Sequence, residues 1–411
     1  MKHYLTICLL VLLVPMLAVS AFGYSVLTHE QLVDMLWDAR LKPLLRARFP
    51  NITPAQLLEA HAYAYGGAVV PDLGYYPFGN QFFSNLVHYA RSGDFIAEML
   101  RESETPDEFA FALGALSHYV GDTVGHPGSV NQAVAIEYPK LRAKYGKYVT
   151  YDEDKIDHLK VEFGFDMDQV ALHRYAPQQY HDYVGFQVSK SLLERVFPVV
   201  YGLTLQQVLP NEDLAIGTFR WSVSRVIPEM TQVALEIHKK DWVHEDPTFS
   251  RQKFLYRLSR SDYNKSWGND YQRPGLGARI LGWLLRLVPK VGPFRALAFD
   301  NPTTQTEKLY INSINASFDH YRAFLESVRS GTLQLPNDDL DDGKPTQAGE
   351  YGLADTTYAL WLAKLDAGNF RATDSALRNN IVAFYAGAPA APPPAVIANL
   401  AQLQRATVLS F

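Results

Sequence analysis

The sequence predicts an all-α fold, and three observations lead to this prediction. Apolar residues recur at helical spacing in most of the chain, for example over 28–49. A threonine followed by proline, a common helix start, occurs at Thr53-Pro54 and at Thr105-Pro106. The sequence contains no convincing period-two run of the kind that marks β-strands, and no internal repeat.

The predicted elements follow in chain order. Gly66-Gly67 is expected to end the second helix, and 69–74 to form a loop. Pro127 is expected to close the third helix. Further along, 335–346 (LPNDDLDDGKPT) is expected to be a loop and 386–394 an extended Ala/Pro spacer. Helices are expected at 28–49, 54–65, 106–125, 130–144, 187–197, 212–226, 229–239, 353–365 and 374–385, with a short one in 395–411.

The amino-terminal segment has the pattern of a secretion signal. Lys2 and His3 precede an apolar run over 5–19, which is short for a membrane span, and small residues follow it. We expect residues 1–23 to be a signal peptide, with cleavage after Ala21 or after Gly23, and the chain to be secreted or periplasmic. Cleavage after Gly23 would make Tyr24 the new amino terminus. An uncleaved anchor helix is the alternative.

Composition narrows the classes of protein further. The chain has 411 residues, 47% of them apolar, and a net charge of −5. This charge argues against a broadly basic nucleic-acid-binding surface. It does not exclude a nuclease, because bound metal ions can supply local positive charge. The only cysteine, Cys8, lies in the leader, so a disulfide framework and a cysteine-ligated zinc site are excluded. A change of character near 245 predicts a catalytic domain over 24–245, a helical region over 246–385 and a spacer and tail over 386–411.

Eight of the twelve histidines lie between residues 29 and 181, and three polar residues there share a helical spacing. His118, Asp122 and His126 are four residues apart, so they form one stripe along a helix that is otherwise apolar. Burying such groups without partners would cost about 1–3 kcal/mol each. Imidazole and carboxylate are good zinc ligands, so a metal site would remove this cost. A polar surface stripe, or an aspartate paired with a core histidine, is the alternative.

Other residues carry weaker signals of the same kind. His158 and Glu162 are four residues apart on a predicted helical turn, where a simple surface pair is also common. Asp72 lies in a loop flanked by glycine and proline, and taken alone it is most simply a turn residue. His88 lies in an apolar helix and, taken alone, would be a core histidine.

In this order, the residues resemble the zinc-dependent phospholipase C family. That family shares its helical fold with fungal single-strand-specific nucleases and with the catalytic domain of glycosylphosphatidylinositol-specific phospholipase D. Its pattern is a processed amino terminus, an early histidine, a Pro-Asp loop, a histidine on the next helix, a His-x3-Asp-x3-to-5-His helix, and a His-x3-Glu or His-x3-Asp pair. The resemblance covers residues 24–240, and the chain carries every step of it.

The resemblance implies three zinc ions. Asp72, His88, His118 and Asp122 would hold one ion, and His126, His158 and Glu162 would hold a second. The backbone amine and carbonyl of Tyr24, together with His29 and Asp122, would hold the third. Three zinc ions against Asp72, Asp122 and Glu162 would leave the site positive, which suits an anionic phosphodiester.

The expected activity is phosphodiester hydrolysis by a phospholipase C with a zinc-activated water, and Asp72 is the candidate for orienting or deprotonating that water. Glu162, where the nucleases tend to have aspartate, favours a phospholipid substrate. The basic amphipathic stretch 271–299 would suit peripheral membrane contact, although a buried helix has the same pattern. A single-strand nuclease, or a non-catalytic zinc-stabilised protein that binds a membrane or partner, is the alternative.

Overall fold

The computed structural model describes residues 26–172, 174–175, 185–227, 231, 234 and 299–406. Within these ranges the regular secondary structure is helical, and the β contact present is an isolated bridge between Asp338 and Pro345. The prediction of an all-α fold is therefore confirmed. The predicted signal peptide, Tyr24, residues 271–298 and most of the helix expected at 229–239 lie outside the described residues.

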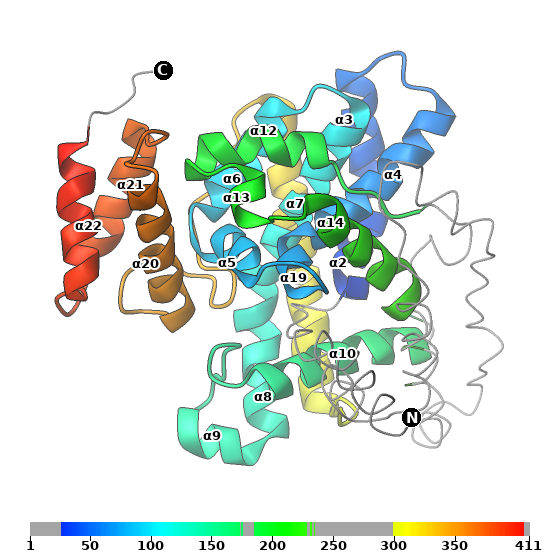
Figure 1. Cartoon of the computed structure of the whole chain (residues 1–411). Coiled ribbons are helices and arrows are strands. Elements are labelled where there is room, and N and C mark those ends of the chain that lie inside the picture. The colour runs from blue at the N-terminus through cyan, green and yellow to red at the C-terminus, as the bar shows by residue number, and fades with distance from the viewer. Residues whose placement is uncertain are drawn as a thin grey trace, which may run out of the picture.

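The amino-terminal half packs around the long helix α7 (Pro106–Gly125; Figure 1). The sequence predicts this helix with the same bounds. Helix α7 begins after a threonine cap, where the Thr105 side chain accepts a hydrogen bond from Glu108 N. The other elements of this half are α2 (Val26–Leu36), η2 (Trp37–Leu41), α3 (Lys42–Arg48), α4 (Pro54–Val69), η3 (Val70–Tyr75), α5 (Gln81–Tyr89), α6 (Ser92–Glu102), η4 (His126–Val130), α8 (Asn131–Glu137), α9 (Pro139–Tyr145), α10 (Lys155–Ala171), α12 (Lys190–Tyr201), α13 (Leu205–Val208), α14 (Glu212–Trp221) and η5 (Ser222–Val226).

Prolines explain two differences from the expected helices. The single helix expected over 28–49 is interrupted by the π-helical η2, because Pro43 has no N–H to donate to the preceding turn. The helix expected over 130–144 is divided at Tyr138, where Pro139 disfavours a helical conformation in the residue before it. Pro127, by contrast, does not end the helical path, which continues through η4 into α8.

The prediction that Gly66-Gly67 ends the second helix is wrong. Helix α4 continues to Val69, and the two glycines are buried within it. A Cβ atom on Gly67 would lie 1.9 Å from the Phe111 carbonyl oxygen on α7, so the glycine allows α4 and α7 to cross in close contact. The segment expected to be a loop at 69–74 then forms the 3₁₀ helix η3.

The carboxy-terminal half contributes four helices to the described structure: α19 (Thr304–Ser330), α20 (Gly352–Ala367), α21 (Ser375–Ala386) and α22 (Pro394–Arg405). Helix α19 packs against α7, and the Tyr321 hydroxyl donates a hydrogen bond to the Leu113 carbonyl oxygen at 2.9 Å. Helices α20, α21 and α22 lie together at one side of the molecule (Figure 1), where Trp361 Nε1 donates to the Tyr201 carbonyl oxygen at 2.8 Å. The division near 245 stays a prediction, but α19 packs directly on the helices before it.

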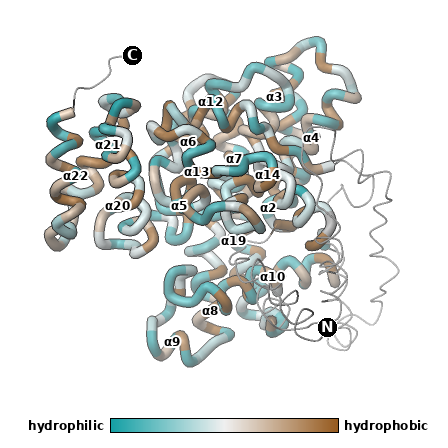
Figure 2. Tube along the Cα trace, viewed as in Figure 1, coloured by the Kyte–Doolittle hydropathy of each residue, from teal (hydrophilic) through white to brown (hydrophobic). Residues whose placement is uncertain are grey.

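Burial follows the apolar pattern of each helix. Hydrophobic and hydrophilic residues alternate along the outer helices (Figure 2), as expected where one face of a helix packs on the core. The central helix α7 is buried along most of its length, including its polar residues Ser117, His118 and Asp122. Among the described helices, none combines the length and the hydrophobicity needed to cross a bilayer.

Candidate metal centre

Helix α7 provides the centre of the site. His118 and Asp122 lie one turn apart on it, both fully buried, and His118 Nε2 lies 2.9 Å from Asp122 Oδ2. His126 follows at the start of η4 and is 2% exposed. The stripe that the spacing predicts therefore faces the interior of the protein and not solvent.

The close crossing of α4 and α7 orients His118 and brings Asp72, which follows α4, near to it. The Ala68 carbonyl oxygen at the end of α4 accepts a hydrogen bond from His118 Nδ1 at 2.9 Å. Asp72 follows in η3, where it is 2% exposed, and the Ser84 hydroxyl ties this turn to α5 by donating to the Pro71 carbonyl oxygen. Helix α5 in turn carries His88.

These elements bring together a first group of ligand atoms. His88 Nε2 lies 3.5 Å from Asp72 Oδ1, 3.5 Å from Asp122 Oδ2 and 3.4 Å from His118 Nε2. One ligand atom from each of Asp72, His88 and His118 fits within a span of 4.8 Å. This spacing suits donors that surround a single cation.

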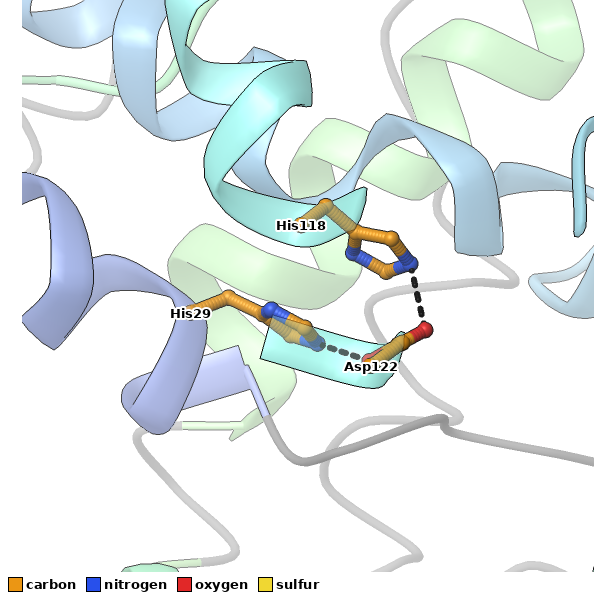
Figure 3. Close-up of side chains that lie close together, drawn as sticks. All are labelled: His29, His118 and Asp122. Carbon is orange, nitrogen blue, oxygen red and sulfur yellow. Dashed lines mark ion pairs between the residues drawn. The ribbon is translucent and has the colours of Figure 1, made fainter. Parts of the chain in front are cut away.

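His29, on α2, completes a second arrangement around Asp122 (Figure 3). Its Nε2 atom lies 3.3 Å from Asp122 Oδ1, and its ring stacks on that of His118 with a centroid distance of 4.1 Å. His29, His118 and Asp122 also offer ligand atoms within 4.8 Å of one another. Gly121 makes this approach possible, because a Cβ atom there would lie 3.1 Å from His29 Nδ1.

A third group approaches Oδ1 of Asp122, the same oxygen that His29 approaches. His158 and Glu162, one turn apart on α10, are buried, with His158 Nδ1 2.9 Å from Glu162 Oε1. His126 Nε2 lies 3.5 Å from the same Glu162 oxygen and 3.7 Å from Asp122 Oδ1. The two oxygens of Asp122 thus face different groups, which is the geometry of a carboxylate able to bridge two ions.

The hydrogen bonds around the group indicate a cation. His88 Nδ1 donates to the Ser84 carbonyl oxygen at 2.8 Å, as His118 Nδ1 does to Ala68. Each ring therefore directs its Nε2 atom, and not Nδ1, towards carboxylate oxygens. Metal-binding histidines in proteins show the same arrangement, with one ring nitrogen donating to a main-chain oxygen and the other free to bind the ion, so the residues present fit zinc.

Burial and the neighbouring charges shift the pKa values of these groups in different directions: against the effect of burial, the carboxylates Asp122 and Asp72 raise the pKa of His88, whereas His158 and Asp122 are shifted towards the forms that bind metals. Burial and the neighbouring His126 lower the pKa of His158 to about 3, so this imidazole is neutral, the form that binds metals. Burial alone would raise the pKa of Asp122, but His118 and His126 outweigh it and hold that pKa well below its usual value. Burial and the charges of Asp122 and Asp72 raise the pKa of Glu162 well above its usual value. A dication beside Glu162 would favour its ionised form.

The comparison with protein families agrees with this geometry. Residues 28–209 match the model of a family described as zinc dependent phospholipase C. The match covers somewhat less than half of the chain, and these residues, called the phospholipase C domain below, are similar to that family. The search of curated proteins and the search of solved structures give no match. The family is one of hydrolases, and residues 28–209 are a phospholipase C-like domain.

The phospholipase C domain contains all of the predicted ligands except Tyr24. His29, Asp72, His88, His118, Asp122, His126, His158 and Glu162 all lie within the matched residues, and the structure brings them together around Asp122. Tyr24 lies before the match and outside the described residues. The assignment of these residues as zinc ligands, and the number of ions, stay predictions.

Sequence reasoning missed one carboxylate that reaches this group from outside the phospholipase C domain. Asp341, in the segment expected to be a loop at 335–346, places Oδ1 3.4 Å from His126 Nδ1. Burial alone would raise the pKa of Asp341, but His126 and His88 lower it to about 2. Its motif, Asp-Leu-Asp-Asp-Gly, is typical of an exposed turn, so no local signal distinguished this aspartate from its neighbours.

A second missed residue, Asp166, holds the start of α2. Its carboxylate accepts hydrogen bonds from Leu27 N at 2.9 Å, from Thr28 N at 3.1 Å and from Thr28 Oγ1 at 2.6 Å. The free N–H groups at a helix start are stabilised by such a negative charge. Asp166 lies one turn after Glu162, so α10 both supplies a candidate ligand and fixes the segment that carries His29.

Proposed function

We propose that the protein is a secreted zinc-dependent phosphodiesterase, a phospholipase C that hydrolyses the head-group phosphodiester of a phospholipid. The observation that carries the proposal is the buried cluster of histidines and carboxylates around Asp122, in a domain of the zinc-dependent phospholipase C family. Secretion rests on the expected signal peptide over 1–23.

The proposed ligands divide into three sets. Asp72, His88, His118 and Asp122 would hold one zinc ion, and His126, His158 and Glu162 a second. His29 and Asp122 would hold a third ion with the amine and carbonyl of Tyr24. The last assignment requires a free amino terminus at Tyr24, so one extra residue before Tyr24 should lower the zinc content, measured by elemental analysis. Unchanged zinc content in that variant would refute it.

The reaction needs water and the phosphodiester. Zinc held by these residues would lower the pKa of a water molecule and offset negative charge on the phosphate. Asp72 would orient the water and accept its proton as the oxygen–phosphorus bond forms. The bond from phosphorus to the glycerol oxygen breaks, and that oxygen takes up a proton from solvent, which balances the proton that Asp72 accepts and later returns. The products are diacylglycerol and a phosphorylated head group.

The residues near Asp72 bear on the head group. Tyr75 and Tyr76 are buried, whereas Phe78 is 58% exposed and has a positive φ of 62°. We expect the aromatic loop 75–78 to contact the substrate, with Phe78 as its accessible member. Membrane contact through 271–299 belongs to the same proposal and lies outside the described residues, apart from Phe299.

Phosphorus NMR of the zinc-loaded protein tests the proposal. One tube holds mixed phospholipid vesicles and a second holds single-stranded DNA. A phosphorylated head-group signal in the vesicle tube, lost on chelation, is expected. Asp72→Asn should abolish it, whereas Asp319→Asn, an exposed aspartate on α19 paired with Arg322, should not.

Other outcomes would redirect or overturn the proposal. A phosphatidate signal would indicate cleavage of the other phosphoester bond, as in a D-type lipase. Mononucleotide signals in the DNA tube alone would indicate the nuclease. If zinc-loaded protein gives no new phosphorus signal in either tube, the non-catalytic alternative is favoured. The zinc site would then be structural, a kind of site closed by protein ligands, whereas catalytic sites keep one position open for water.

A further inference from the structure

The four histidines of the first and second ligand sets are oriented by different parts of the chain. The first set uses main-chain oxygens inside the phospholipase C domain, where Ser84 and Ala68 accept from His88 and His118. The second set depends on Asp341, which lies more than a hundred residues beyond the matched region. This difference makes the two sets separable by mutation.

Asp341 reaches both histidines of the second set. Its carboxylate Oδ1 lies 3.4 Å from His126 Nδ1, while His126 Nε2 faces Glu162 and Asp122. Its main-chain oxygen accepts a hydrogen bond from Asn131 Nδ2 at 2.8 Å. The Asn131 amide oxygen therefore accepts from His158 Nε2, at 3.0 Å, and leaves His158 Nδ1 to face Glu162.

The loop around Asp341 is held firmly against the helices of the site. The Tyr89 and Tyr351 hydroxyls donate to Asp341 Oδ2 at 2.8 Å and 2.6 Å, and Leu340 N donates to the His88 carbonyl oxygen at 3.2 Å. Gly343, with a φ of 70°, lies so close to α7 that a Cβ atom would be 2.3 Å from the Thr123 carbonyl oxygen. The loop therefore packs against Thr123, the residue that follows Asp122 on α7.

We propose that the loop over 335–346 supports the metal centre through one residue, Asp341, which is the positioning residue of the second ion. Its carboxylate holds His126 with Nε2 directed inward, and its main chain does the same for His158 through Asn131. Carboxylates and carbonyls that orient metal-binding histidines raise metal affinity about 10–100-fold. The proposal rests on the proposed zinc ligands and gives a role to the region after 246.

Zinc content measured against a series of zinc-buffered solutions tests this role. The full-length Asp341→Ala variant should lose zinc from one class of site, with its apparent affinity lowered about 10–100-fold, while the remaining zinc binds as in the parent. Asp341→Asn keeps an acceptor oxygen and should lose less. Asn131→Ala, which cuts only the link to His158, should weaken the same class of site.

Two controls separate positioning from damage to the fold. Asp342→Asn alters the neighbouring carboxylate, which pairs with Lys344 near the surface, and should leave zinc binding unchanged. Tyr351→Phe removes one donor to Asp341 but leaves His126 facing it, and should retain the full zinc content. Circular dichroism checks that each variant is helical.

The outcomes are distinguishable. Parent-like zinc affinity in both Asp341→Ala and Asn131→Ala would overturn the inference and leave the proposed function intact. Equal loss of every zinc ion in folded Asp341→Ala would also overturn it, because the role would then be general. A parent protein that binds no zinc would overturn the proposed function itself.

Discussion

Replacing Gly114 with alanine tests how closely the metal centre depends on the crossing of α4 and α7. A Cβ atom at residue 114 would lie 2.0 Å from the Ala64 carbonyl oxygen and 2.9 Å from Ala68 N. An ordinary contact begins near 3.4 Å, so the two helices would have to separate by about 1.4 Å. No flexible side chain can yield, because both contacts are to backbone atoms.

The separation has consequences for stability and for the site. Overpacking of this kind costs about 1–3 kcal/mol, whereas alanine in place of glycine inside a helix ordinarily gains about 0.5–1 kcal/mol. The predicted effect therefore has the opposite sign from helix propensity. The hydrogen bond from His118 Nδ1 to Ala68 O is now 2.9 Å and would not survive a shift of that size. Misplacement by about 1 Å costs about a hundredfold in activity.

Thermal unfolding and zinc content measure both effects in Gly114→Ala. We expect a lower melting temperature, weaker zinc binding and a hydrolysis rate reduced about a hundredfold. Gly387→Ala is the matched control, because a Cβ atom there has no neighbour within 4 Å and the site is distant in sequence. A Gly114→Ala protein that melts at or above the parent temperature and holds the full zinc content would refute the reasoning.

Three further predictions concern charge and metal. Asp122→Asn should abolish hydrolysis and reduce bound zinc, because Asp122 faces all three ligand sets; full activity in an initial-rate assay would exclude it as a ligand. Chelation should lower the melting temperature, since the buried oxygens of Asp122 and Glu162 have no hydrogen-bond donor among the described residues; an unchanged temperature would contradict this. Burial and Asp300, opposed by Thr306, raise the pKa of Glu137 to about 7. The protonated carboxyl of Glu137 therefore stabilises the fold fully below pH about 4.5, and this contribution is lost as the pH rises through about 7. Denaturant titration should find Glu137→Gln more stable than the parent by a margin that grows above pH about 4.5 and levels off at about 3 kcal/mol above pH about 7.

Local sequence signals predict the helical architecture of α7 and the grouping on it. The threonine-proline start gives the helix, and the four-residue spacing of His118 and Asp122 places them on one face. Helical spacing cannot show whether that face is buried, and the structure shows that it is. The zinc assignment rests on the ordered set of residues and its resemblance to a family.

Long-range packing explains what the sequence could not predict. Gly66-Gly67 has the local pattern of a helix end, but the glycines serve the contact with Phe111 on a helix far along the chain. Asp341 lies in a motif typical of a surface turn, yet Tyr89 and Tyr351 hold it beside His126. A single sequence does not show which distant residue will cover a buried polar atom.

Anomalous X-ray diffraction at the zinc edge tests the central claim most directly. Crystals of the protein purified with zinc should show anomalous peaks within ligand distance, about 2.0–2.2 Å, of the histidine nitrogens and carboxylate oxygens around Asp122. One peak should lie among Asp72, His88 and His118, and another among His126, His158 and Glu162. Peaks elsewhere, or none among these side chains in crystals soaked in zinc, would contradict the account.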